Sequence, residues 1–339
     1  MKFGVLLNAE YPADELIALG RLCEDLGYDQ LWYTDIRMFR ECYLGLAAIA
    51  AHTRRIHLGP GVTDPYSRHP AVTASTIATL DEMTGQRALL GLGVGLTGFR
   101  ELGIRAEHPV AALRETVDLV RRLLRGEEIT FQGKVISLAG GKLQFAPVRT
   151  SIPIYFATQG QRITELAGEV ADGVMIANTA LPSAVDFYLD CVRRGAEKGR
   201  RTLSDVDVVL RFEMCISGHP AQADAVMRRR VAMRVAAGYG HWDYLERLGI
   251  TLPQAFIDIA ARRDLRAAAD ASHLLPPEAV ERMVLAGDSA GVAAQLARAL
   301  RPGVTRVIVR PHAVAGESHG DVLRRFANEV MPRVPAAVH

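Results

Sequence analysis

The chain has 339 residues and a formal net charge of +2, and 49% of its residues are hydrophobic and 23% are charged. These proportions are those of an ordinary globular protein and exclude a chain dominated by disorder. No basic tract is interleaved with aromatic residues, so nucleic acid is not an expected partner. The N-terminus reaches polar residues at once and no apolar run of about 18 residues follows, so we expect a soluble, cytoplasmic protein without a membrane partner.

Four cysteines are scattered along the chain, with no Cys-x-x-Cys pair and no histidine at the spacing of a metal ligand. They are Cys23, Cys42, Cys191 and Cys215. This usage indicates structural thiols in a reducing compartment, and we expect no metal site.

Short apolar runs alternate with amphipathic stretches through the first 126 residues. Each run fits a buried strand, and the stretch after it has helical spacing, with Gly27, Gly85 and Gly126 as stop signals. The expected strands are 2–7, 30–34, 56–58 and 88–92, and the expected helices are 13–26, 44–52, 71–83 and 110–124. Repetition of strand, polar crossover and helix favours a parallel sheet with helices outside.

This rhythm is interrupted once and then resumes. Residues 128–145 alternate around Gln132-Gly133 and Gly140-Gly141, which predicts a β-hairpin insert. Further strands are expected at 154–157, 173–176, 206–216 and 305–309, and further helices at 163–170, 183–198, 289–300 and 321–330. The helix-rich segment 218–286 is too long for one crossover, and we interpret it as a helical insertion before the last strand, near the mouth of a barrel.

The strands, eight in all, follow the rhythm of an α/β protein of the (β/α)8 TIM-barrel class. A doubly wound open sheet would alternate in the same way, but no Gly-x-Gly-x-x-Gly follows the first strand. No linker rich in proline, glycine or serine divides the chain, so we predict a single barrel domain over residues 1–339.

The active site of a parallel barrel forms where strands end and helices begin. Five segments that follow predicted strands are therefore candidates, namely 34–41, 59–70, 91–95, 158–162 and 177–179. Glycines cluster at three of these five ends, which suits close approach of the backbone to a flat ligand. The loop Thr158–Gln161 opens a helix whose first amides lack intrahelical partners, so it is a candidate for binding a phosphate.

Charged residues after the second strand are the candidates for chemistry. Asp35 stands at the strand end and could hold or transfer a proton; the alternative is a helix cap or an ion pair with Arg37 or Arg40. Those two arginines are candidates for clamping an anionic substrate, with a structural salt bridge as the alternative. His69, before Pro70 at a helix start, is interpreted as a packed or capping residue rather than a catalyst.

Several motifs along residues 1–180 resemble the luciferase-like monooxygenase superfamily. They are Trp32-Tyr33-Thr34-Asp35, the run from Leu58 to Pro70, Ala78-Thr79-Leu80-Asp81-Glu82, Gly91 to Gly95, Leu123 to Glu127, Ile152 to Tyr155 and Glu169 to Val174, with a weak return at Leu285 to Ser289. Their shared order makes the resemblance specific for the superfamily and not for a substrate. The chain most resembles the branch similar to methylenetetrahydromethanopterin reductase, which depends on coenzyme F420.

The resemblance implies a barrel that holds a deazaflavin ring against the third and fourth strand ends and its phosphate at Thr158–Gln161. It also implies a bulge with a non-proline cis peptide, by position Gly61–Val62, that presses on one face of the ring; a plain tight turn is the alternative for Gly61. A homodimer is implied as well. The candidate cofactor-binding residues are Gly61, Val62, Thr63, Gly93, Val94, Gly95, Ala157, Thr158, Gln159, Gly160, Gln161 and Asn178.

Two departures from the family pattern bear on the chemistry. Many deazaflavin members carry Asp-His after the second strand, with the histidine as acid or base, whereas this chain has Asp35-Ile36. Asp35, or a group of the substrate, would then take that role. A polyglutamate tail meets no lysine cluster, because Lys134, Lys142 and Lys198 are isolated in the sequence; arginines would serve instead. Both departures leave FMN open as the cofactor.

The leading hypothesis is an oxidoreductase that transfers a hydride between reduced coenzyme F420 and a small organic substrate. An FMN-dependent monooxygenase on the same fold is the alternative, and a barrel that binds a cofactor or ligand without turnover is the alternative from another class. No lysine stands at a strand end to form a Schiff base, which argues against an aldolase. The substrate stays open, because the insertion 218–286 and the variable loops would select it.

Overall fold

The computed structural model describes residues 1–95, 99 and 101–334 of the chain. Its main sheet has nine strands, and eight of them follow one another in the order β3-β2-β1-β11-β9-β8-β7-β4. Their bounds are β1 Lys2–Leu7, β2 Gln30–Tyr33, β3 His57–Pro60, β4 Leu90–Leu92, β7 Ile154–Thr158, β8 Gly173–Ala177, β9 Asp207–Ile216 and β11 Arg306–Pro311. Each predicted strand overlaps one of these strands.

The strand pairings confirm the predicted fold class. The registers of β1 with β2, β2 with β3, β4 with β7 and β9 with β11 are parallel. The two ends of the order, β3 and β4, are joined by parallel bridges from Leu58 to Ala88 and from Thr63 to Leu92. Parallel strands that follow the order of the chain, with helices in the crossovers, form a (β/α)8 barrel.

The chain divides into two compact units. The 4–175 unit comprises residues 4–175 and 191–207, and the 208–339 unit comprises residues 1–3, 176–190 and 208–339. Helix α6 (Pro182–Lys198) contributes residues to both. The prediction of a single domain over residues 1–339 stays a prediction, and the division into two units does not test it.

Helices fill the crossovers of the 4–175 unit because their apolar residues recur at three- and four-residue spacing. Helix α4, for example, buries Leu113, Val117, Val120 and Leu124 along one face. Helix α3 ends at Gly85, whose φ of +67° glycine adopts without strain. The helices of this unit are α1 Ala13–Asp25, α2 Cys42–His52, α3 Pro70–Thr84, α4 Pro109–Leu124 and α5 Gln161–Val170.

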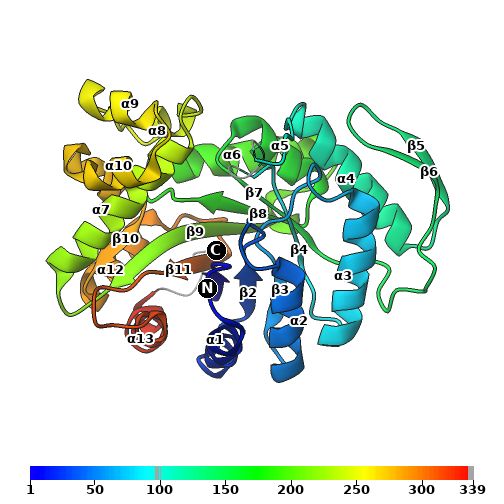
Figure 1. Ribbon diagram of the computed structural model, residues 1–339, viewed down its shortest axis with the longest axis horizontal. Helices are drawn as coiled ribbons and strands as arrows, with labels where there is room; N and C mark the ends of the chain where they lie inside the picture. Colours follow the sequence, from blue (N-terminus) through cyan, green and yellow to red (C-terminus); the bar gives the residue numbers. More distant parts are fainter. Residues whose placement is uncertain (96–98, 100, 335–339) are drawn as a thin grey trace. The chain divides into compact units, whose positions relative to one another are not determined.

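A β-hairpin lies beside α4 (Figure 1). Its strands, β5 (Ile129–Gln132) and β6 (Ser137–Gly141), pair antiparallel inside the range expected for an insert. Glu115 of α4 accepts hydrogen bonds from the backbone N–H groups of residues 134, 135 and 136 at 2.7, 3.1 and 2.9 Å. These charge-assisted bonds to one carboxylate hold the hairpin turn on the helix.

In the 208–339 unit, the segment 218–286 forms helices that share an apolar core. Helix α7 (Pro220–Ala237) contributes Met227 and Val231 to it, and shorter helices gather at one end of α7 (Figure 1). The other helices of the unit are α8 Asp243–Arg247, α9 Gln254–Ala260, α10 Leu265–Asp270, α11 Pro277–Glu281, α12 Ser289–Ala299 and α13 His319–Arg325. Within the described ranges, no helix combines the length and apolar character needed to cross a membrane.

Two local features of this unit differ from expectation. Strand β10 (Leu285–Gly287) pairs in parallel with the end of β9, although the sequence predicts a helix-rich segment there. Three residues are too few to show an alternating pattern, which explains the miss. The helix expected at 321–330 ends at Arg325, and residues 326–330 continue as a π-helical turn.

Strand β3 carries a one-residue bulge at its end. Between the two bridges to β4, the chain advances five residues from Leu58 to Thr63, while the partner advances four residues from Ala88 to Leu92. The peptide bond of Gly61–Val62, inside this bulge, is cis. Both the bulge and its cis bond confirm what the family resemblance implies.

Gly91 of β4 leaves room for the bulge, and its replacement is our first prediction. A Cβ on Gly91 would lie 2.1 Å from the carbonyl oxygen of Pro60. A backbone carbonyl cannot rotate away as a side chain can, so Gly91→Ala should lower the free energy of unfolding by about 1–3 kcal/mol. Denaturant unfolding of both proteins measures the difference.

Gly218→Ala is the matched control, because a Cβ there meets no atom within 4 Å. We expect its free energy of unfolding to change by less than about 0.5 kcal/mol. Equal losses in the two variants would contradict the packing role assigned to Gly91.

Candidate functional site

Three strand ends of the 4–175 unit lie level with one another. Thr63 is bridged to Leu92 of β4, and Leu92 pairs with Phe156 of β7. Because all three strands are parallel, the residues that follow them leave the sheet at the same edge. The structure thus brings the predicted segments 93–95 and 157–161 to one edge with Thr63.

Glycines at this edge make room for protein groups. A Cβ on Gly93 would lie 2.5 Å from Cγ2 of Val62. Gly95 has a φ of +62°, and a Cβ there would lie 2.5 Å from a guanidinium nitrogen of Arg37. The sequence pattern suggests a flat ligand as the reason for these glycines, and the structure adds a packing reason. Their contact with a cofactor remains a prediction.

Asp35 follows β2 and has 20% of its side chain exposed. Its Oδ2 lies 3.9 Å from Nε of Arg68, and Arg68 also pairs with Glu41 at 2.8 Å. Burial raises the pKa of Asp35 above its usual value. The Thr63 hydroxyl and the Arg68 guanidinium offset part of this rise, and the negative charges of Glu41 and Asp64 add to it.

The structure also answers the alternatives weighed for these polar residues. The ion pair of Asp35 is with Arg68. The carboxylate that caps α2 belongs to Glu41 and not to Asp35. His69 caps α3, because its Nδ1 accepts the N–H of Ala71 at 3.1 Å, which is the capping role expected of it.

Three buried polar atoms near Asp35 make no hydrogen bond of ordinary geometry to a described group. They are Oη of Tyr43, Oγ1 of Thr63 and Nε of Arg68. The Arg68 guanidinium lies over the Tyr43 ring, 4.7 Å from its centroid. These polar groups still act on one another: the Thr63 hydroxyl interacts with Asp35 and with Tyr43, and Arg68 forms an ion pair with Asp35. They form one polar cluster around the Asp35 carboxyl. The sequence offers no signal for Tyr43, and Arg68 appears only inside a family motif.

Arg37 and Arg40 have different partners. Nη1 of Arg37 donates to Oδ2 of Asp64 at 2.5 Å, and its guanidinium lies 4.2 Å from the centroid of the Phe99 ring. Arg40 is exposed and donates to the carbonyl oxygen of Glu10 at 2.7 Å. Arg37 therefore forms a structural salt bridge, which was the alternative to a role in substrate binding. A substrate clamp made of both arginines remains a hypothesis.

The loop before α5 has the geometry of an anion site. The hydroxyl of Thr158 accepts the N–H of Gly160 at 2.9 Å, and Gly160 is the N-cap of α5. The N-cap has no side chain to satisfy the amides of the first turn, which begins at Gln161. Those amides and the positive end of the helix dipole suit a phosphate.

Asn178 belongs to the 208–339 unit. It is fully buried and has a φ of +52°. Its backbone N–H donates to the carbonyl oxygen of Arg211 at 2.7 Å, but neither Nδ2 nor Oδ1 bonds to a described group. The ligand contact expected of Asn178 remains a prediction.

A buried ion network of the same unit is absent from the sequence predictions. Glu213 accepts from Arg211 at 2.7 Å, from Arg310 at 3.4 Å and from His312 at 2.5 Å. Burial alone would raise the pKa of Glu213, but the charges of Arg310 and Arg211 and the hydrogen bond from His312 hold it well below its usual value. Burial lowers the pKa of Arg211 to about 10. The sequence does carry a signal for this network, because Arg211 and Glu213 stand inside the otherwise apolar strand β9.

The acidic, histidine and cysteine side chains of the described residues are spread apart. No group of three or more His, Cys, Asp or Glu side chains there is arranged to hold a metal ion. All four cysteines are buried and outside any disulfide.

Known proteins share both the sequence and the fold. The model of the luciferase-like monooxygenase family matches residues 1–306. The chain is 38% identical over 261 residues to the 5,10-methylenetetrahydromethanopterin reductase of Methanolobus tindarius, which covers 76% of this chain and 78% of that protein. It is 30% identical over 246 residues to the F420-dependent glucose-6-phosphate dehydrogenase of Microbacterium testaceum, which covers 68% and 72%.

Among solved structures, the coenzyme F420-dependent tetrahydromethanopterin reductase of Methanopyrus kandleri aligns with a TM-score of 0.87 and 28% identity. The alignment covers 98% of this chain and 99% of that one. Because the family model spans most of the chain, this protein belongs to the luciferase-like monooxygenase family.

Proposed function

We propose that this protein is an oxidoreductase that transfers a hydride between coenzyme F420 and a small organic substrate. The relatives that support this act on different substrates, a pterin derivative in one case and a sugar phosphate in another. Coenzyme F420 is named for the dehydrogenase and for the aligned Methanopyrus structure. The cofactor is therefore the best supported part of the proposal. A homodimer in the cytoplasm is also proposed, the first from the family resemblance and the second from the buried, free cysteines.

The observation that carries the proposal is the polar cluster of Asp35, Tyr43, Thr63 and Arg68. Hydride transfer to or from an organic molecule is accompanied by gain or loss of a proton. Asp35 has a pKa raised by burial, so it keeps its proton to a higher pH than an ordinary aspartate. The Thr63 hydroxyl and the Arg68 guanidinium stabilise the carboxylate once the proton has left.

The residues also fit the cofactor in kind. The first-turn amides of α5 are suited to its phosphate, and the bulge at Gly61–Val62 borders the edge at which the ring would lie. When bound, coenzyme F420 supplies the hydride acceptor or donor. The protein orients the two reactants, limits water, and holds a proton on Asp35, which is the role this chain can fill without a histidine at position 36.

Titration with the cofactor under anaerobic conditions tests this function. We expect coenzyme F420 to bind saturably, seen as a change in deazaflavin absorbance. Reduced coenzyme F420 should then be oxidised by an added hydride acceptor, and methylenetetrahydromethanopterin is the first to try. In the other direction, oxidised coenzyme F420 should be reduced by a hydride donor, and glucose-6-phosphate is the first to try. FMN is the parallel ligand. Binding of FMN with oxygen consumption, and none of coenzyme F420, would establish the monooxygenase alternative, and binding of neither would indicate a barrel without redox function.

Replacement of Asp35 tests the direction in which the rate depends on pH. Because the pKa of Asp35 lies above its ordinary 3.8, the rate of substrate reduction should fall as pH rises through that raised value. Asp35→Asn should lower kcat by about 10²- to 10⁴-fold, the usual contribution of a general acid, and should remove this falling limb. The measurement is the pH profile of single-turnover hydride transfer.

Glu41→Gln provides an independent check on the same group. The negative charge of Glu41 raises the pKa of Asp35, and its carboxylate also occupies Arg68. Its removal should therefore move the falling limb to lower pH. A limb that stays in place in Glu41→Gln, or that persists in Asp35→Asn, would assign the titration to another group.

A further inference from the structure

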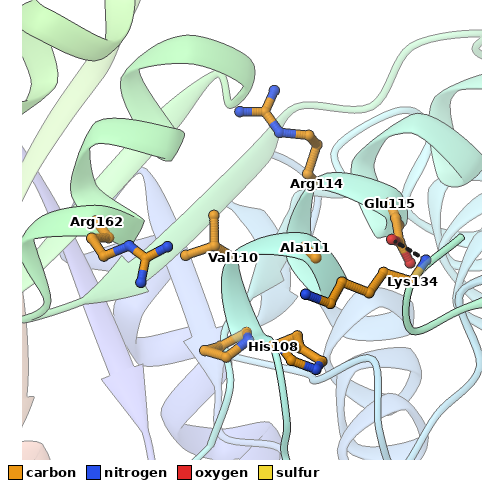
Figure 2. A pocket seen from close by; sticks show the side chains of 8 residues that line it. His108, Val110, Ala111, Arg114, Glu115, Lys134 and Arg162 are labelled. Atoms are coloured by element: carbon orange, nitrogen blue, oxygen red, sulfur yellow. Dashed lines mark hydrogen bonds between the residues drawn. The ribbon is translucent and has the colours of Figure 1, made fainter.

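A groove of about 450 Å³ lies at the N-terminal ends of α4 and α5 in the 4–175 unit. His108, Lys134 and Arg162 line it from three different segments: the approach to α4, the hairpin turn and α5 (Figure 2). Arg162 directly follows the loop Thr158–Gln161, the candidate phosphate site. None of the predicted site residues lines the groove, so it is a separate feature.

The groove carries positive charge that the described residues do not balance. Its Arg114 is neutralised by a two-point ion pair with Glu169, at 2.7 and 2.6 Å. Glu115, the acidic residue in the lining, is turned to the hairpin amides. The Lys134 and Arg162 side chains form no ion pair or hydrogen bond with a described residue. Figure 2 shows them extending toward the first turn of α4 from opposite sides.

An adjoining groove shows how arginines with a purely structural role are arranged. It has a volume of about 440 Å³ and shares Arg114 with the first. Its Arg121 pairs with Asp172 at 3.1 Å, and its Arg125 pairs with Glu127 at 2.7 Å. Charge in that groove is balanced within the protein, whereas Lys134 and Arg162 are left for an outside anion.

The N-terminal ends of α4 and α5 add to the positive electrostatic potential of the groove. α4 has 16 residues and α5 has 10, and neither has a side-chain hydrogen bond at its N-cap. The positive ends of both helix dipoles lie at residues that line or directly precede the groove. Two cations from different segments and the first-turn amides of two helices give the groove several positive groups, which suits an anionic chain that carries more than one charge.

We propose that this groove binds a carboxylate-bearing arm of the coenzyme, continuing outward from the phosphate at the start of α5. The inference rests on the proposed function. It follows from continuity, because Gln161 ends the candidate phosphate loop and Arg162 begins the groove. The contacts are exposed, so each contributes little and salt weakens them. The arm therefore adds a modest, salt-sensitive increment to affinity and leaves the chemistry at Asp35 unchanged.

The experiment compares coenzyme F420 that carries its polyglutamate tail with the same compound after the tail has been removed. Wild-type protein should bind the tailed form about three- to tenfold more tightly at low salt, as expected for two exposed charge contacts. Lys134→Ala/Arg162→Ala should reduce this ratio of Kd values to about one while the Kd of the tail-free form stays the same. Added NaCl should reduce the wild-type ratio in the same way.

Lys142→Ala/Arg125→Ala is the matched control, since it removes the same two residue types from exposed positions that do not line the groove. The control variant should keep the wild-type ratio. A wild-type ratio of one, or a ratio retained by Lys134→Ala/Arg162→Ala, overturns the assignment. Equal weakening of both ligand forms overturns it too, because the cations would then act on the phosphate. Failure of wild-type protein to bind either form would instead reject the proposed function.

Discussion

The position of the loop after β3 depends on two backbone hydrogen bonds that Thr63 makes with β4. Its N–H donates to Gly91 at 3.0 Å and its carbonyl accepts from Gly93 at 2.9 Å. Because Leu58 is also paired with β4, the chain between must fit five residues opposite four, and the surplus forms the bulge. The same two bonds bring the Thr63 hydroxyl beside Asp35, so strand register and site chemistry have one cause.

Two aspartates near this bulge show how environment separates structural from chemical carboxyl groups. Asp64 is 2% exposed and accepts four hydrogen bonds: two from backbone N–H groups, one from Ser67 Oγ and one from Arg37. Asp35 has an ion pair of 3.9 Å and a pKa raised by burial. A carboxylate with all its acceptor sites used holds a loop in place. One whose pKa is raised by burial, as at Asp35, keeps its proton to a higher pH than an ordinary aspartate does.

Sequence periodicity predicts most of the fold, because buried strands and amphipathic helices are local patterns. It predicts every barrel strand and places the hairpin within 128–145. Lateral contacts are harder to predict, since they join distant segments: Arg68 reaches Asp35 from 33 positions away, and Arg37 meets Asp64 rather than standing free. Charge networks such as that of Glu213 cross between strands and leave no periodic trace.

Lys134 illustrates the same limit at the surface. It is isolated in the sequence. The three hydrogen bonds from backbone N–H groups of the hairpin turn to Glu115 place it at a groove that Arg162 of α5 also lines. Barrel register fixes the edge at which the strand ends lie, and the hairpin insert adds a groove beside α4 without disturbing that register. Exposed cations accelerate the encounter with an anionic ligand more than they prolong its residence. Under the proposed function, the ring and its arm would be bound by different parts of the fold, the barrel edge and the groove beside the hairpin.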